Sequence, residues 1–215
     1  MAVNGLKQFM TKIGAKGGMS YSTNFDVEFS FGSTSDSPAP AFVKDFAGED
    51  KNVIQMLCDE AQLPNVQSAV SQRSGRNLGE GPVSYPHTRI FTDISLGFLL
   101  DADLTALKFI NTWYNYIFDE DNVQYSGFEG AITASPLSEN RVNRLKYLDQ
   151  YAATLRIMKT EPNSNSERGR VPVTYLLEKC YPYSIDTVPL AYGSSQVSRL
   201  TCNFYYSRHT VAYGK

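Results

Sequence analysis

Two histidines are the first residues to consider for acid–base chemistry or for metal binding. His87 lies beside Pro86 in a predicted loop, and His209 lies near the end of the last predicted strand. A site centred on histidine needs further ligands or a partner base at a defined spacing, and no such residues lie nearby in the sequence. We therefore interpret both histidines as ordinary surface or pocket residues.

Two short runs have residue types that bind ions. Asp119-Glu120-Asp121 could attract a cation, but three adjacent carboxylates at a helix end are more typical of a solvated face, and the EF-hand spacing is absent. The glycine-rich run at residues 14–18 does not match the phosphate-binding pattern GxxxxGK followed by Ser or Thr, and no strand precedes it. Neither run predicts a binding site.

The three cysteines, Cys58, Cys180 and Cys202, each lie in a strand-like pattern, which favours small buried hydrophobic residues over nucleophiles. They lie too far apart for a CxxC metal motif, and their odd number argues against a secreted disulfide framework. We expect a protein that is assembled in a reducing cytoplasm. No feature of the sequence supports an enzyme, so we predict no catalytic residues, no metal site and no cofactor.

The composition is that of a single folded domain. The chain has 215 residues, of which 42% are hydrophobic and 20% are charged, and its 20 Lys and Arg against 22 Asp and Glu give a net charge of −2. A near-neutral chain lacks the basic excess of a dedicated nucleic-acid binder. It has no apolar run of the length of a membrane span and no hydrophobic signal core at residues 1–7, so we expect a soluble protein without a membrane anchor.

The elements that must position any functional surface are mainly strands. Aromatic residues make up 13% of the chain, and many alternate with polar residues, as in half-buried strands. The clearest case is residues 24–31, where Phe25, Val27, Phe29 and Phe31 share one face. Further strands are predicted at residues 53–63, 66–73, 88–100, 151–160, 172–181 and 198–208.

Other segments connect or cover these strands. Residues 1–18 predict a short amphipathic arm outside the main core, and residues 32–50 a turn-rich loop. Residues 65–100 predict a long β-hairpin with a glycine-rich tip. Residues 101–119 predict the one clear helix, with Asp101 or Asp103 as its cap. Residues 120–150 are interpreted as an insertion of mixed character.

Several long strands with a single covering helix leave sheet edges open, and open edges invite pairing with another chain. Oligomerisation through these edges is one way to close them. The arm and the hairpin tip suit the same interpretation, since both could become ordered against a neighbouring subunit. From the residues alone, the arm and the tip are equally compatible with being loose surface loops.

Four segments in the same order carry a family resemblance. They are the strand at residues 24–29 after a glycine-rich arm, the segment Leu57-Cys58-Asp59-Glu60-Ala61-Gln62-Leu63-Pro64, the helix around Phe109, Trp113 and Tyr114, and the segment at residues 177–185. Together they resemble the tail tube protein of contractile-tailed, T4-like bacteriophages, most closely those of marine phages. In the family the last segment is a turn before the closing strand, and here Cys180 stands where glycine is frequent. Residues 32–50 and 120–150 resemble additions to a smaller family core.

The resemblance implies a structural virion protein and no enzyme. Its fold would be an antiparallel β-sandwich or barrel with one flanking helix, as in the type VI secretion tube, forming one tail tube domain over residues 1–215. Six copies would form a ring, and stacked rings would form the tail tube. Its partners would be the sheath, the tape-measure protein, and the baseplate and tail terminator proteins, with transient passage of double-stranded DNA. Such a protein would be assembled in the host cytoplasm and would reside in the virion tail.

The resemblance also implies which residues meet the channel and the neighbouring rings. The long hairpin would line the lumen through its polar positions Gln67, Ser71, Arg73, Thr88, Thr92 and Ser95, although simple alternation does not place all six on one face. The candidates for contacts between rings are Leu6, Phe9, Met10 and Ile13 in the arm, and Arg76 and Leu78 in the hairpin tip. A lumen that lets a polyanion slide suits uncharged or acidic contacts better than a basic stripe.

Two alternatives stay open. A baseplate-attached tube initiator has the same fold and would form a single ring. A small β-rich enzyme that degrades the cell wall belongs to another class, and it would need paired carboxylates or zinc ligands, which the sequence does not supply at a suitable spacing.

Overall fold

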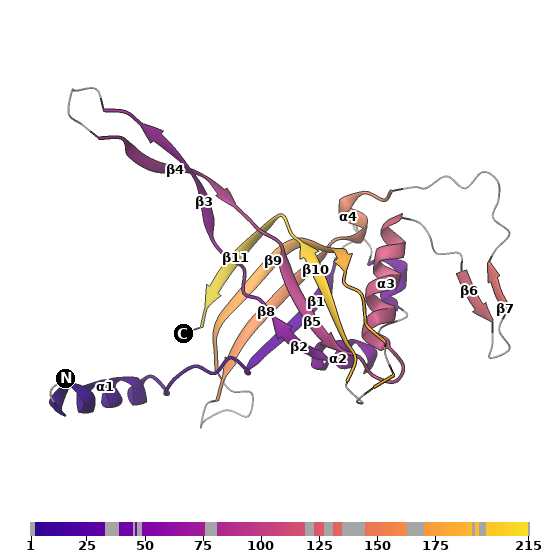
Figure 1. The fold of residues 1–215 in the computed structure, drawn as a ribbon, viewed down its shortest axis with the longest axis horizontal. Coiled ribbons are helices and arrows are strands. Elements are labelled where there is room, and N and C mark those ends of the chain that lie inside the picture. Colours follow the sequence, from indigo (N-terminus) through magenta and orange to yellow (C-terminus); the bar gives the residue numbers. More distant parts are fainter. Residues whose placement is uncertain are drawn as a thin grey trace.

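The main body is a seven-stranded antiparallel sheet (Figure 1). The computed structural model describes residues 3–32, 39–44, 46, 49–75, 81–118, 123–126, 131–134, 145–162, 170–190, 192–193 and 197–214. The strand order is β1 (Phe25–Phe31), β8 (Ala153–Glu161), β9 (Arg170–Ile185), β10 (Arg199–Tyr205), β5 (Ile94–Leu99) and β2 (Cys58–Ala61), and β11 (Arg208–Tyr213) also pairs with β9. The predicted class, mainly antiparallel β with few helices, is confirmed.

Strand β9 belongs to both halves of this sheet. Its first part pairs with β8 and β11, and its last part pairs with β10. Between them Lys179 has a φ of 53°, an uncommon conformation for a residue other than glycine, and the strand changes partner there. The segment at residues 177–185 is therefore the bent part of a strand, and the turn that the resemblance implied there is wrong.

The last predicted strand, residues 198–208, is two strands. β10 ends at Tyr205 and β11 begins at Arg208, opposite the bend in β9, where the N–H of Ser207 donates to the carbonyl oxygen of Glu178 at 3.0 Å. The alternation of apolar and polar residues continues through the break between β10 and β11. The sequence pattern therefore does not show where the chain crosses from one half of the sheet to the other.

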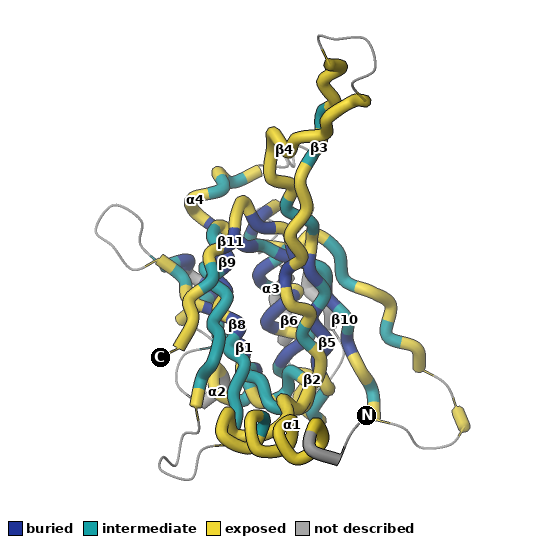
Figure 2. Tube along the Cα trace, turned by 90° about the vertical axis from the view of Figure 1, so that its left-hand side faces the viewer, coloured by how far each residue is buried: buried dark blue, intermediate teal, exposed yellow. Residues whose placement is uncertain are grey.

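The two halves enclose one aromatic core. Phe29 of β1 and Phe204 of β10 have ring centroids 5.7 Å apart, and both rings contact Trp113, at 5.9 Å and 6.0 Å. Trp113 lies on α3 (Thr105–Phe118) and is fully buried, and its indole N–H donates to the carbonyl oxygen of Tyr151 at 2.8 Å. Figure 2 shows the buried residues gathered between the strands and α3.

Helix α3 lies within the predicted residues 101–119 and begins with the expected cap. Asp101 accepts from the backbone N–H and from the hydroxyl of Thr105, each at 2.7 Å. The side-chain hydrogen bond from Thr105 holds the pKa of the Asp101 carboxyl below its usual value. Every third or fourth side chain of the helix then faces the sheet, as the spacing predicted.

The strand predicted over residues 53–63 is wrong in its first half. The structure has α2 (Glu49–Met56) there, followed by the short strand β2. Ile54 is buried, Val53 and Leu57 are half-buried, and the N–H of Leu57 donates to the carbonyl oxygen of Val53 at 2.9 Å. A short apolar run fits a helix face as well as a strand, and here packing beside β1 and α3 selects the helix.

The predicted hairpin over residues 65–100 consists of two units. β3 (Gln67–Arg73) and β4 (Val83–Ile90) form a separate two-stranded ribbon, whereas β5 lies in the main sheet between β2 and β10. Residues 88–100 are therefore not one strand, because residues 91–93 interrupt it. Figure 1 shows the ribbon standing away from the sheet.

The remaining elements are short or lie outside the sheet. They are α1 (Val3–Ala15), the 3-10 helix η1 (Ala41–Lys44), the paired strands β6 (Val123–Ser126) and β7 (Ala131–Ala134), and α4 (Leu148–Tyr151). Most of the predicted loop at residues 32–50 and of the insertion at residues 120–150 lies outside the described residues. No helix in the described ranges has the length and apolar character needed to cross a membrane.

Candidate assembly surfaces

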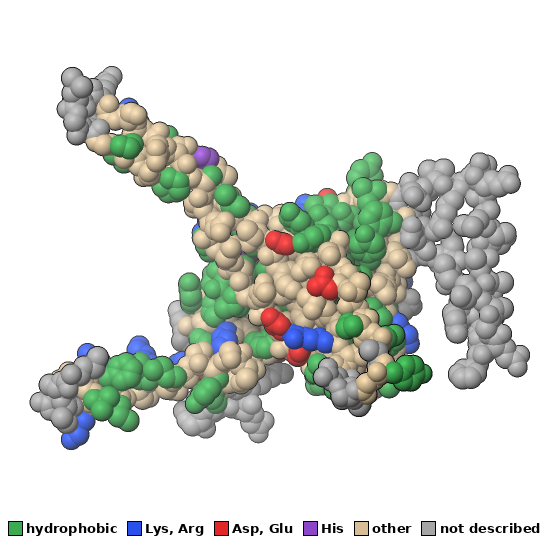
Figure 3. All heavy atoms as spheres, in the orientation of Figure 1, with side chains coloured by type: hydrophobic (Ala, Val, Ile, Leu, Met, Phe, Trp, Pro, Cys, Tyr) green, Lys and Arg blue, Asp and Glu red, His purple; other side chains and the backbone are tan. Residues whose placement is uncertain are grey.

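The N-terminal arm carries an apolar stripe that the described part of the chain leaves largely exposed. Leu6, Phe9 and Met10 of α1 are 58%, 52% and 65% exposed, and Ile13 is half-buried. Residues at this spacing lie on one side of a helix. Figure 3 shows these hydrophobic side chains on an arm that projects from the body. The structure therefore brings the four arm candidates together on one exposed surface.

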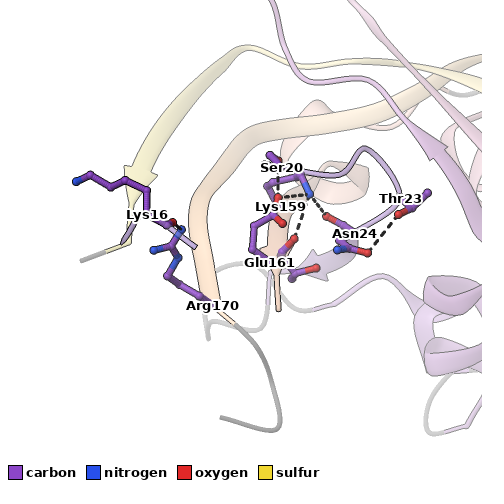
Figure 4. A network of polar contacts seen from close by, with 8 residues as sticks. Lys16, Ser20, Thr23, Asn24, Lys159, Glu161 and Arg170 are labelled. Carbon is purple, nitrogen blue, oxygen red and sulfur yellow. Dashed lines mark hydrogen bonds and ion pairs between the residues drawn. The ribbon is translucent and has the colours of Figure 1, made fainter. Parts of the chain in front are cut away.

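The root of the arm is held by a polar network (Figure 4). The Lys159 ammonium group lies 2.8 Å from a carboxylate oxygen of Glu161 and donates to the carbonyl oxygen of Asn24 at 2.7 Å. Glu161 also accepts a hydrogen bond from the hydroxyl of Ser20. The hydrogen bonds from Lys159 and then from Ser20 lower the pKa of Glu161. This network fixes the chain from Ser20 onward to the end of β8.

Two glycines separate the fixed root from α1. Gly17 and Gly18 have φ values of 91° and 92°, which residues with a side chain rarely adopt. The N–H of Gly18 donates to the carbonyl oxygen of Ile13 at 3.0 Å, which closes the end of α1. Across this joint, Arg170 donates to the carbonyl oxygen of Lys16 at 3.3 Å. The direction of the arm is therefore set at these glycines.

The β3–β4 ribbon is exposed along its length. All eight residues of β4 are exposed, and β3 has no buried residue. Within the described residues neither outer edge of the ribbon pairs with another strand. An isolated two-stranded ribbon is marginal in water, and its two free edges offer unpaired backbone groups to another chain.

The cross-strand pairs place four of the six lumen candidates on one face of the ribbon. Gln67, Ser71 and Arg73 alternate along β3, and Thr88 lies opposite Ala69 on the same face. That face also carries three exposed apolar side chains from β4, which are Val83, Tyr85 and Ile90. It is therefore a mixed face, suited to contact with protein as well as with water.

The other two lumen candidates lie elsewhere. The hydroxyl of Thr92 donates to the side-chain oxygen of Asn65 at 2.7 Å, which ties the two strands of the ribbon together at its root. Ser95 lies on β5 opposite Asn203 of β10, on the face of the main sheet that points away from the core. The six candidates therefore do not share one face.

That outward face of the sheet carries mainly polar side chains, with Leu99 and Tyr205 as exposed apolar ones at its ends. Along β10, Leu200, Cys202 and Phe204 are buried, whereas Thr201 and Asn203 point away from the core. Over β5 and β10, the face in view in Figure 3 is mostly polar, with a compact group of charged side chains. The alternation along residues 198–208 indicated this face, but the sequence did not show that it lies beside Ser95.

The two histidines differ in their surroundings, since His209 is buried and His87 is exposed. His209 is buried beside Phe91 and Tyr206 at the root of the ribbon, with ring centroids 5.3 Å and 5.8 Å away. Burial, and then the nearby Arg89, lower the pKa of His209. His87 lies on the exposed ribbon, where its ring nitrogen is 2.7 Å from the hydroxyl of Thr88.

The described ranges contain no group of three or more His, Cys, Asp or Glu residues placed to hold a metal ion. Two of the candidates for ring contacts, Arg76 and Leu78, lie outside the described residues, as does the acidic run at residues 119–121.

Comparison with known proteins gives a family and a fold. The sequence profile described as "Phage tail tube protein" matches residues 20–212. None of the curated proteins compared with the chain matches it.

Solved structures with similar folds come from contractile injection systems. One is the sheath-tube complex of an extracellular contractile injection system in its extended state, with a TM-score of 0.55, 10% identity, and coverage of 94% of this chain and 97% of that one. A second is the tube terminating cap of the anti-feeding prophage, with a TM-score of 0.54, 12% identity, and 91% of each chain covered. A third is the anti-feeding prophage baseplate, with a TM-score of 0.53, 15% identity, and coverage of 91% and 96%. At these identities the likeness shows the fold.

Proposed function

The chain belongs to the phage tail tube protein family, and from this premise we propose that its copies assemble into rings that stack into the inner tube of a contractile phage tail. The β3–β4 ribbon is the observation that carries the proposal. Neither of its strands has a buried residue, and within the described residues neither of its outer edges pairs with another strand. A ribbon of this kind becomes stable when a second copy pairs with it or covers it.

We propose that the ribbon of one copy meets a different surface on the next copy. Such an interface is head-to-tail, and repeated head-to-tail contacts close into a ring when the rotation permits. We propose six copies per ring, as the resemblance implies. The mixed face with Val83, Tyr85 and Ile90 suits the contact with the next copy.

We propose that the arm joins successive rings. In its apolar stripe Leu6, Phe9 and Met10 are more than half exposed in the single subunit and Ile13 is half-buried. Complete burial of a fully exposed side chain of this kind contributes about 1.5–3 kcal/mol, so covering the part still exposed contributes a fraction of that for each. The fixed root at Ser20 and the glycine joint at Gly17 and Gly18 let α1 turn toward a neighbouring ring while the body stays in place.

We propose that the polar outward face of β5 and β10 lines the channel. Ser95, Thr201 and Asn203 give this face short polar side chains with no basic stripe, which suits the passage of DNA and the tape-measure protein. The sheath, the baseplate and the tail terminator are the proposed protein partners. A baseplate tube initiator of the same fold is the alternative, and it would form one ring instead of a stack.

Electron microscopy of the purified chain tests this proposal. We expect rings or sheath-free tubes at high protein concentration, with tube length separating a main tube from an initiator that stops at one ring. The variant Val70→Glu/Val83→Glu puts charges on exposed apolar positions of the ribbon and should abolish assembly. Met56→Glu, at an 83% exposed position at the end of α2, is the matched control and should assemble. A stable wild-type monomer at high concentration, even with a baseplate template, would contradict the proposal.

A further inference from the structure

One arginine lies flat across the polar face of the sheet. Arg199 begins β10, and its Nε is 3.2 Å from a carboxylate oxygen of Asp59 on β2, while its Nη2 bonds to the carboxylate of Glu60. The guanidinium reaches β2 by crossing β5 at Gly97. A Cβ on Gly97 would lie 2.6 Å from Nη2 of Arg199 and 2.9 Å from an oxygen of Asp59, so glycine leaves room for this contact.

The surroundings of Arg199 are acidic. It is the only basic residue in β2, β5, β10 and residues 180–185 of β9, all of which the structure describes. Asp59 and Glu60 lie within these ranges, and Asp93 and Asp186 flank them. Within these ranges one guanidinium stands against two carboxylates, a net charge of 1 − 2 = −1, and among the residues that border them Asp93 and Asp186 are acidic and Lys179 is basic. Asp93 also accepts a hydrogen bond from the hydroxyl of Tyr183.

We propose that Asp59 and Glu60 hold Arg199 in an ion pair so that it does not bind the phosphates of DNA. The inference rests on the proposed function, in which this face lines the channel. A free guanidinium binds phosphate through two parallel hydrogen bonds. Stacked rings would repeat that contact along the tube, and many weak contacts would then retain the DNA. With both carboxylates in place, Nε and Nη2 of Arg199 face protein oxygens.

The test removes the ion pairs of Arg199 while the two partner side chains keep nearly the same shape. The variant Asp59→Asn/Glu60→Gln removes both negative charges, and adding Arg199→Gln gives a control with the same losses and no cation. Tubes of each are sedimented with a short fluorescent DNA duplex at 50 mM and 200 mM salt. The melting temperature of each variant shows whether β2 remains in place.

We expect the double variant to sediment the duplex, and wild-type and triple-variant tubes to leave it in solution. Retention should fall roughly 3- to 4-fold per arginine–phosphate contact between the two salt concentrations. If the double variant does not assemble, Glu60→Gln alone is compared in the same way, since that side chain is 56% exposed and Asp59 still pins the strand. Tubes that form but retain no more DNA than the triple variant would overturn this inference alone. Failure of wild-type protein to form hollow tubes would overturn the proposed function instead.

Discussion

Replacing the β3–β4 ribbon by a tight turn should separate folding from assembly. The change joins Val66 to Phe91 through Asn-Gly in place of residues 67–90, just above the hydrogen bond between Asn65 and Thr92 at 2.7 Å. Asn-Gly suits a two-residue hairpin connection, and the strands on either side of it are already held together at this point.

The expected effect on stability is small because no described residue of the ribbon is buried. A single substitution at an exposed position changes the free energy of unfolding by about 0.5 kcal/mol or less. We expect removal of the exposed ribbon to stay on that scale, which is roughly 1–2 °C in the melting temperature of a chain of this size. The shorter connection contributes a small stabilising closure entropy in the opposite direction. The melting temperature should therefore stay the same or rise slightly.

A substitution in the core shows how large a loss of stability would be if the ribbon were part of the core. Phe29 is 5% exposed and contacts Phe109, Trp113 and Phe204. Phe29→Ala should cost about 3–5 kcal/mol, or roughly 6–20 °C. Both variants are melted by circular dichroism below the concentration at which the wild-type protein assembles, because assembly itself raises apparent stability.

Sedimentation velocity and electron microscopy then measure assembly. The ribbon-less protein should remain a folded monomer at concentrations where the wild type forms rings. Two results would refute the reasoning. A loss of many degrees would mean that the ribbon is part of the subunit core, and normal rings without the ribbon would mean that other surfaces close the ring.

Four further predictions concern the body and the arm. Trp113→Phe leaves a buried carbonyl oxygen, now 2.8 Å from the indole nitrogen, without its donor, and should cost about 1–3 kcal/mol in chemical denaturation; an unchanged midpoint would contradict the packing described. Burial raises the pKa of the Cys58 thiol to about 12, so iodoacetamide at pH 8 should leave it unmodified in the folded protein and modify it after unfolding. The pKa of Asp101 is lowered from 3.8 by its hydrogen bonds, so its ionised form stabilises the fold above that pH and the benefit is lost as the pH falls through the lowered value. Asp101→Asn should therefore lower the melting temperature at pH 7, and the gap to wild type should close below about pH 3.8, whereas a constant gap would argue against a role of the charge. Gly18→Ala places a side chain on a residue with a φ of 92°, which costs roughly 1–2 kcal/mol. Trypsin should therefore cut the arm faster, with no change in the melting temperature of the body. Gly5→Ala, where an added Cβ would have no contact within 4 Å, is the control and should leave the cleavage rate unchanged.

Sequence patterns predicted those elements whose side chains alternate or recur within one segment. In residues 24–31 the four apolar positions fall on one face, and β1 forms there. Trp113 and its neighbours recur at helical spacing, and α3 forms there with Asp101 as its cap. These signals are local, so no knowledge of the rest of the fold was needed.

The errors arose where distant contacts decide the structure. Residues 53–56 become helical because Ile54 packs into a core supplied by other segments. Thr88 and Ser95 were assigned to one strand, and the pairing of β5 with β10 separates them. The ion pair of Arg199 with Asp59 depends on the register of two strands far apart in the chain, which alternation alone does not specify.

The pairing of β1 with β8 also determines the order in which the strands of a newly made chain can form the sheet on the ribosome. The β3–β4 ribbon is local and closes within microseconds of leaving the exit tunnel, whereas β1 must wait for β8, which is 128 positions away at the pair of Glu28 and Arg156. Each nascent chain therefore exposes its β3–β4 ribbon before its main sheet has formed, and the main sheet is the surface on which the ribbon of another copy could dock. Polysomes that place such chains side by side would favour mispairing, and wide spacing of ribosomes or a chaperone on the nascent ribbon would protect the yield of competent subunits.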